Sequence, residues 1–263
     1  MLKYIILIFS IIMGTSLTTY QKNVYNPIIA HRGGWNAKNL PENSIASLKH
    51  AIELGCAGSE FDVHMTADNI LVICHDSKFY GLEIEKVNYQ DLLTYVLSNK
   101  EKIPTLEAYL KAGTKKNKHT RLVLEIKPSG ISKERSIQIA ENVYNLVKKM
   151  KAENMIDYIS FDIDILKTLI NLNPSVSTQY LNGDMPPMDL KALGISGLDY
   201  NFKVYKQEPQ WIPEAKKLNL ILNAWTVNDV DDIDFFLSQN FDFITTNEPE
   251  LAKERLDELM HSK

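Results

Sequence analysis

The chain has 263 residues, of which 44% are hydrophobic, and its 29 basic and 33 acidic residues give a net charge of -4. This length and apolar content can bury one large core, and α/β barrels often reach this length as a single domain. The nearly balanced charge offers no basic stripe for nucleic acid and no acidic tail. We therefore exclude a nucleic-acid partner and a solvating, disordered chain.

The N-terminus has the layout of a secretory leader. Lys3 is followed by the unbroken apolar run "YIILIFSIIM" and by the small residues "GTS". The run is too short to span a bilayer, and this order is typical of a signal peptide. We predict a leader at 1–20, an exported protein that is periplasmic or secreted, and no stable membrane insertion after cleavage. A buried N-terminal strand or helix is the alternative.

From Pro27 onward, strand-like and helix-like segments alternate. The predicted strands are 27–31, 58–65, 68–76, 121–128, 155–161, 176–181, 196–202, 220–228 and 241–247. The predicted helices are 44–55, 89–97, 105–113, 132–150, 164–173, 188–194, 211–219, 230–240 and 249–260. Asn43 or Ser44 can cap the first helix, Gly55 can stop it, and Ser132 can cap the long one.

About eight strand-then-helix units fill residues 25–260 without a linker rich in proline or glycine. Eight such units predict a single-domain (β/α)8 TIM barrel, whose functional sites lie at the C-terminal ends of the strands. An open doubly wound sheet is the alternative, but no strand is followed by its G-x-G-x-x-G turn. Cys56 and Cys74 flank an extended segment, four residues of which already span about 13 Å. We therefore expect two buried free thiols rather than a disulfide.

Charged residues gather at the ends of a few predicted strands. Glu60 and Asp62 point to one face of their strand, as do Glu125 and Lys127 of another. A carboxylate inside a barrel is costly unless it is paired or bound to a cation. Three such carboxylates predict a site for one divalent cation, Ca²⁺ or Mg²⁺. Ion pairs with Lys127 or Arg32 are the alternative reading.

Two histidines extend this pattern. His31 closes the first strand, in "AHRGG", and His75 closes the segment "ICHD". Histidine transfers protons near neutral pH, and cations such as Arg32 and Lys127 can hold the oxygens of a phosphate. The combination indicates phosphoryl chemistry beside a metal ion, although a single histidine could equally be a hydrogen-bonded core residue.

An ordered set of motifs resembles the glycerophosphodiester phosphodiesterase family. The set is "AHRGG…PENS", "GSEFDVHMTADNILVICHD", "IPTLEAYL", "LVLEIKP", "ISF", "NAWTVN" and "FITTNEP", from about Pro27 to Pro249. Any one motif is common, but the ordered set is specific. The resemblance implies metal-dependent hydrolysis of a glycerophosphodiester to sn-glycerol 3-phosphate and an alcohol. It also allows attack by the glycerol 2-hydroxyl, with a cyclic phosphate formed first.

The resemblance also assigns roles, position by position. It implies that His31 and His75 are the catalytic acid and base, in either order, and that Glu60, Asp62 and Glu125 are metal ligands. It implies phosphate or substrate contacts for Arg32, Lys127, Trp225 and Glu42. Trp225 could pack on the glycerol carbons or fill a core position. Glu42 and Asn43 would hold a turn and cap a helix, and Gly33 and Gly34 would let the backbone turn beside the phosphate.

The resemblance weakens after His75. The family's threonine-rich loop is missing, and the residues from His75 to Pro104 are too few for an inserted domain, so only a short segment is expected here. The specificity for the alcohol is thus open. Asn247 replaces a family aspartate and would cap the last helix. Two other functions remain: a phospholipase D-like enzyme acting on lysolipid or another phosphodiester, and a non-catalytic exported binding module.

Overall fold

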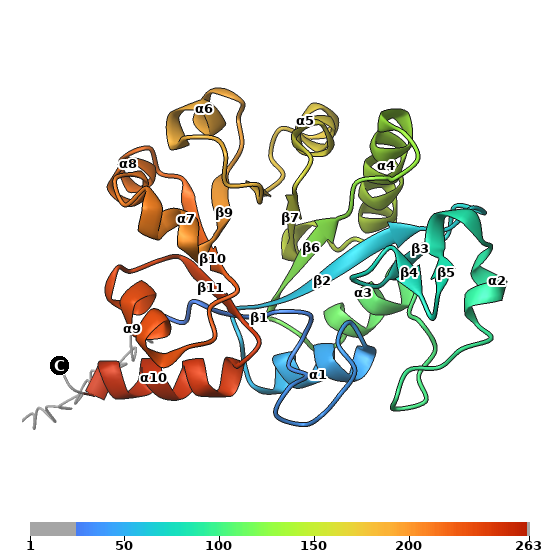
Figure 1. The fold of residues 1–263 in the computed structure, drawn as a ribbon, viewed down its shortest axis with the longest axis horizontal. Helices are drawn as coiled ribbons and strands as arrows, with labels where there is room; N and C mark the ends of the chain where they lie inside the picture. The colour runs from blue at the N-terminus through green and yellow to red at the C-terminus, as the bar shows by residue number, and fades with distance from the viewer. Residues whose placement is uncertain (1–24, 262–263) are drawn as a thin grey trace, which may run out of the picture.

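Eight parallel strands close into a barrel in the computed structural model, which describes residues 25–261 (Figure 1). They are β1 (Ile28–Ala30), β2 (Gly58–Met65), β6 (Arg121–Ile126), β7 (Ile156–Ser160), β8 (Thr178–Tyr180), β9 (Gly197–Asn201), β10 (Ile221–Trp225) and β11 (Phe243–Thr246). β1 completes the circle, because Ala30 pairs with Thr246 on one side and with Ser59 on the other. The predicted (β/α)8 barrel is confirmed, and the open sheet is excluded.

Helices surround the strands. They are α1 (Ile45–Glu53), α3 (Leu106–Thr114), α4 (Lys133–Lys149), α5 (Ile163–Leu172), α6 (Pro187–Ala192), α7 (Phe202–Gln207), α8 (Trp211–Lys217), α9 (Val230–Ser238) and α10 (Pro249–His261). Their buried faces pack against the outside of the barrel and form the largest apolar core. In α4, for example, Ile139, Val143 and Val147 recur every fourth residue and are buried. The short helix α7 directly after β9 was not predicted.

The inside of the barrel has a smaller apolar core. Ile29, Val123, Ile159 and Leu181 pack together there, and each alternates along its strand with residues of the outer core. Trp225 and Phe243 pack against this group. The apolar group therefore fills only part of the interior, and polar side chains occupy the rest.

Local signals set most helix ends. Ser44, rather than Asn43, caps α1, where its hydroxyl accepts from the Ser47 N–H, and Ser132 caps α4 as predicted. Gly55 follows α1 with a φ of +66°, in accord with its predicted role as a stop.

Residues 66–104 form an appended segment on the side of β2, where β3, β4, β5 and α2 lie together in Figure 1. β3 (Leu71–Ile73) runs antiparallel to β2, and β4 (Lys78–Phe79) and β5 (Leu82–Glu83) form a small hairpin. The 3₁₀ helix η1 (Ile84–Lys86) and α2 (Tyr89–Leu92) follow. The expected short segment in place of an inserted domain is present.

The appended segment differs from its prediction in two respects. The expected helix 89–97 is wrong beyond the single turn of α2, and the expected strand 68–76 shrinks to three residues. The reason is tertiary: the apolar residues of this stretch serve a small separate core. That core consists of Val72, Phe79, Ile84, Leu92 and Ile103.

Neither cysteine of the chain forms a disulfide, as predicted. Cys56 is buried, but Cys74 is partly exposed, so the expectation of two buried thiols is wrong for Cys74. The predicted leader at 1–20 lies outside the described residues. Within residues 25–261, no helix has both the length and the apolarity needed to cross a membrane.

Candidate active site

A pocket of about 110 Å³ opens at the C-terminal ends of the barrel strands. One part of its wall is charged and another is apolar, with Ile159, Phe161 and Leu181 contributing to the apolar part. The ionisable residues of the wall are His31, Arg32, Glu60, His75, Glu125, Lys127 and Asp199. The barrel thus brings together here seven of the nine residues singled out from the sequence, Trp225 among them, and the other two, Asp62 and Glu42, contact this group.

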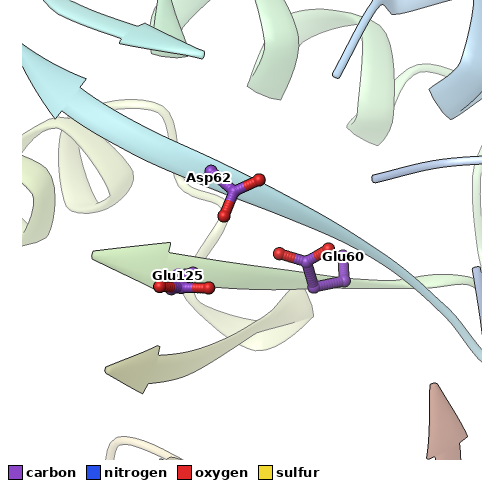
Figure 2. Close-up of side chains that lie close together, drawn as sticks. All are labelled: Glu60, Asp62 and Glu125. Atoms are coloured by element: carbon purple, nitrogen blue, oxygen red, sulfur yellow. The ribbon is translucent and has the colours of Figure 1, made fainter. Parts of the chain in front are cut away.

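Glu60, Asp62 and Glu125 form the carboxylate cluster of this pocket. Glu60 and Asp62 lie on one face of β2, and Glu125 lies directly across from Asp62 on β6. One carboxylate oxygen from each lies within 4.8 Å of the other two, and all three residues are buried. Figure 2 shows the three carboxyl groups converging from the two strands. Oxygen donors this close together match the ligand set of a hard divalent cation.

Lys127 supplies only part of the positive charge that the cluster needs. Its Nζ lies 2.8 Å from Asp62 Oδ1 and 2.6 Å from Glu125 Oε1. Burial raises the pKa of Asp62, but the Lys127 ammonium and a hydrogen bond from Asn43 outweigh it and lower that pKa to about 2. Burial and the Asp62 charge raise the pKa of Glu125 to about 8.

Within the part of the chain that the structure describes, no lysine ammonium forms an ion pair with Glu60. Burial, followed by the charges of Asp62 and Glu125, raises its pKa well above the usual carboxyl value, and its Oε1 has no hydrogen-bond partner within residues 25–261. The carboxylate cluster is therefore short of positive charge, and a divalent cation fits this deficit.

Arg32 lies at the edge of the carboxylate cluster with a φ of +56°. Its backbone N–H donates to Glu60 Oε2 at 2.8 Å, and its Nη1 donates to Glu42 Oε2 at 2.9 Å. Its buried Nε lies 3.9 Å from Asp62 Oδ2 and makes no hydrogen bond to the described residues. Glu42 thus orients the guanidinium and leaves its buried Nε–H available for an anion.

Asn43 has a larger part in the site than the sequence suggested. Its Nδ2 donates to Asp62 Oδ2 at 2.8 Å, and its Oδ1 accepts from the Asp62 N–H at 3.1 Å. Asn43 is buried with a φ of +56°, a backbone region that asparagine tolerates. The expected capping role is wrong; Asn43 instead fixes the orientation of Asp62. Its place in "PENS", beside a glutamate, was the only signal in the sequence.

His31 follows β1 at the wall of the pocket. Its Nδ1 lies 2.7 Å from Asn247 Oδ1, and its Nε2 lies 3.9 Å from Glu60 Oε2. Burial and then the Arg32 charge lower the pKa of His31 to about 4. Asn247 was expected to cap the last helix, but its side chain holds the imidazole of His31 instead.

His75 reaches the pocket from the appended segment. Its Nδ1 lies 2.7 Å from Asp76 Oδ1, and its side chain is 35% exposed. His64, the histidine of β2, does not line this pocket. Its Nε2 lies 3.3 Å from the backbone oxygen of His75, so it supports the loop that carries His75.

Trp225 and Asp199 lie at the opposite wall. The indole Nε1 donates to the Asp199 backbone oxygen at 2.7 Å, and the indole ring meets Phe161 edge to face at 5.6 Å. Trp225 therefore has a satisfied N–H and also lines the pocket. Asp199 was not singled out from the sequence. It is buried, and its Oδ1 has no hydrogen-bond partner among the described residues.

The two glycines after Arg32 have a packing role. A Cβ at Gly33, where φ is +83°, would lie 2.5 Å from Ser47 Oγ, and one at Gly34 would lie 2.9 Å from His50 Nδ1. The close approach of α1 thus disfavours a side chain at both positions, and the positive φ of Gly33 confirms the predicted turn. Its place beside a phosphate stays a prediction.

The closed barrel and the groups at its mouth, three carboxylates, two imidazoles and two cationic side chains, define the chain as a (β/α)8-barrel enzyme of phosphodiester chemistry. The model of the glycerophosphoryl diester phosphodiesterase family matches residues 31–251. The chain belongs to this family.

Relatives of known sequence or structure agree with this placement. The chain is 30% identical over 239 residues to a glycerophosphodiester phosphodiesterase of Caldanaerobacter subterraneus subsp. tengcongensis, covering 85% of this chain and 94% of that one. A glycerophosphodiester phosphodiesterase from Parabacteroides distasonis, known from a crystal structure, is 44% identical in sequence and matches the fold with a TM-score of 0.86. The match covers 90% of this chain and 98% of that one. A phosphodiesterase from Oleispira antarctica, solved with the product sn-glycerol-3-phosphate, shares the fold at 24% identity and a TM-score of 0.79, with coverage of 89% and 97%.

Proposed function

We propose that this chain hydrolyses glycerophosphodiesters to sn-glycerol 3-phosphate and an alcohol, with one divalent cation, Ca²⁺ or Mg²⁺, bound by Glu60, Asp62 and Glu125. The observation that carries the proposal is the meeting of the carboxylate cluster, His31, His75, Arg32 and Lys127 at one pocket. Family membership and the names of the relatives support the substrate class.

The cationic side chains would bind the phosphate. Arg32 Nε is buried and has no hydrogen-bond partner within the described residues, so it can donate to a non-bridging oxygen. Lys127 is held by Asp62 and Glu125 and adds positive charge at the same wall. A bound divalent cation would supply charge stabilisation for the phosphoryl oxygens.

The two imidazoles would divide the proton transfers. Asn247 engages Nδ1 of His31 and Asp76 engages Nδ1 of His75, so Nε2 of each ring is left for the reaction. One ring removes a proton from the attacking hydroxyl while the other protonates the departing alkoxide. When water attacks directly, one step gives sn-glycerol 3-phosphate and the alcohol. When the glycerol 2-hydroxyl attacks first, the alcohol leaves with a proton from one ring, and a water then opens the cyclic phosphate with the two rings in exchanged roles. Either route breaks the P–O bond to the alcohol and consumes one water.

The test is a matrix of metals against substrates with the purified protein from which the leader is absent. We expect turnover of glycerophosphocholine and release of sn-glycerol 3-phosphate that stops with a chelator and returns with Ca²⁺ or Mg²⁺. Release of product only from lysophosphatidylcholine would favour the phospholipase D-like alternative. Stoichiometric binding of a glycerophosphodiester without its turnover, whichever metal ion is added, would favour a binding module.

Export is part of the proposal. The basic, apolar and small-residue order of 1–20 supports a cleaved leader and a periplasmic or secreted enzyme. Cell fractionation, with mass spectrometry of the mature N-terminus, tests it. A full-length chain in the cytoplasmic fraction would contradict it.

A further inference from the structure

Tyr80 occupies a backbone position that does not suit it. The pairs Lys78–Glu83 and Phe79–Leu82 leave Tyr80 and Gly81 as the two turn residues of the β4–β5 hairpin. Both have positive φ, +48° and +85°, the geometry of a type I′ turn. This turn prefers Asn-Gly, and a bulky residue in its first position is an outlier. A strained residue of this kind, close to an active site, directs attention to its side chain.

The Tyr80 ring is held in place yet left open to solvent. It stacks on Tyr95 with centroids 4.9 Å apart and planes 5° apart, and it meets Phe79 edge to face at 4.9 Å. Its hydroxyl donates to the Val96 backbone oxygen at 2.7 Å. Tyr80 nevertheless remains 57% exposed, so burial of the ring does not account for the strained turn. The hairpin presents a fixed aromatic surface.

The Tyr80 ring also lines a second pocket, next to the first. His75 lines both pockets, and the second one also includes Tyr80, Phe79, Glu42 and Asp76. A phosphodiester whose phosphate binds at Arg32 and Lys127 would have space beyond His75, in the second pocket, for one of its two ester groups. In the orientation we infer, that group is the departing alcohol.

The second pocket carries more negative than positive charge. One carboxylate oxygen of Glu42 contacts Arg32, and one of Asp76 contacts His75. The Glu42 side chain is 42% exposed and the Asp76 side chain is 77% exposed. Lys78, the basic residue of this wall, lies 3.8 Å from Glu83. Carboxylates beside an open aromatic ring form a suitable environment for an organic cation, because the face of the ring attracts positive charge.

We propose that this second pocket binds the alcohol portion of the substrate and that Tyr80 makes it select alcohols bearing a positively charged ammonium group. The inference rests on the proposed function and adds the chemistry of the leaving group. An exposed aromatic patch could instead contact a lipid surface, but the acidic residues around it would be repelled by an anionic bilayer.

The experiment measures kcat/KM for two substrates that differ in charge and match in shape. These are glycerophosphocholine and its neutral isostere, the 3,3-dimethylbutyl ester of glycerol 3-phosphate. For Tyr80→Asn we expect the ratio of the two values to fall roughly two- to fivefold, the measure of a cation–π contact at an exposed site. Asparagine suits a type I′ turn, so the melting temperature of this variant should hold or rise.

Tyr80→Phe is the matched control. It keeps the ring, loses only the hydrogen bond to Val96, and should keep the wild-type ratio. If Tyr80→Asn lowers kcat/KM equally for both substrates, or for neither, the proposed subsite is refuted while the proposed function stands. Loss of binding to anionic vesicles with an unchanged ratio would assign the ring to a lipid surface and also overturn the inference. A wild-type protein that cleaves no glycerophosphodiester would instead refute the proposed function itself.

Discussion

His31 belongs to the barrel and His75 to the appended segment, and the two imidazoles are held in different ways. His31 follows a strand that is hydrogen-bonded on both sides, and its side chain is 18% exposed. Its imidazole contacts the half-buried amide of Asn247, which follows the neighbouring strand β11. His75 is 35% exposed and pairs with its own neighbour, the well-exposed Asp76. The barrel therefore fixes its share of the site through many distant contacts, whereas the appended segment relies on local ones.

The carboxylates, like His31, are held by residues distant in sequence, whereas the tyrosines of the appended segment, like His75, are held by local contacts. Asp62 is oriented by Lys127, which directly follows β6, and by Asn43 of the loop after β1. Tyr80 and Tyr95 stand on a core of five buried residues that is separate from the barrel. This difference suggests that the chemistry depends on the barrel and the choice of alcohol on the appended segment.

Loss of the buried imidazole should have the largest effect. We expect His31→Ala to lower kcat about 10²- to 10⁴-fold, the usual contribution of a general acid or base. The circular dichroism spectrum should not change, because a polar residue at a strand end adds little to the core. His119→Ala, at an exposed histidine outside the pocket, is the control. Full activity in His31→Ala would refute the assignment.

Removal of the amide that orients Asp62 should weaken the metal site. Asn43→Ala should lower the affinity for Ca²⁺ or Mg²⁺ about 10- to 100-fold, as is usual for partners of metal ligands. Titration calorimetry on chelator-treated protein measures it. Asn39→Ala is a matched control, because Asn39 is exposed and also has a positive φ, +50°. Equal losses in both variants would indicate a backbone effect and contradict the orienting role.

Loss of Asn247, the partner of His31, should lower kcat more than loss of Asp76, the partner of His75. Asn247→Ala removes the hydrogen bond to His31 Nδ1, and we expect a decrease in kcat of up to about tenfold. Steady-state kinetics at fixed, saturating metal isolates this effect from metal binding. An unchanged kcat would mean that the strand alone positions the ring.

The smallest decrease in kcat is expected for a change at Asp76, the exposed partner of His75. Asp76→Asn keeps the size of the side chain and removes a charge that solvent already screens, so kcat should fall less than about fivefold. The same assay compares it directly with Asn247→Ala. A larger loss at Asp76 than at Asn247 would reverse the comparison between the two regions.

Spacing within a strand and order along the chain predicted much of the site. Alternation placed Glu60 with Asp62 and Glu125 with Lys127, because side chains two residues apart share a face of a strand. The same alternation could have found Asp199, which lies inside the predicted strand 196–202 rather than at its end. The helix expected at 89–97 failed because its apolar residues serve a local core, which periodicity cannot distinguish from a helix face.

The amino-acid sequence by itself determined the alternation of strands and helices, the barrel class, and which carboxylates, histidines and cations would meet at one end of the barrel. The elements and the grouping of the carboxylates follow from local periodicity and strand parity, which depend on neighbouring residues. The histidines and cations followed from their places at predicted strand ends and from the ordered motifs that resemble the family. Only the tertiary structure decided that Asn43 holds Asp62, that Asn247 holds His31, and that Tyr80 stands beside a second pocket. Those contacts join residues up to 216 positions apart, and side-chain orientation across such separations depends on the closure of the barrel.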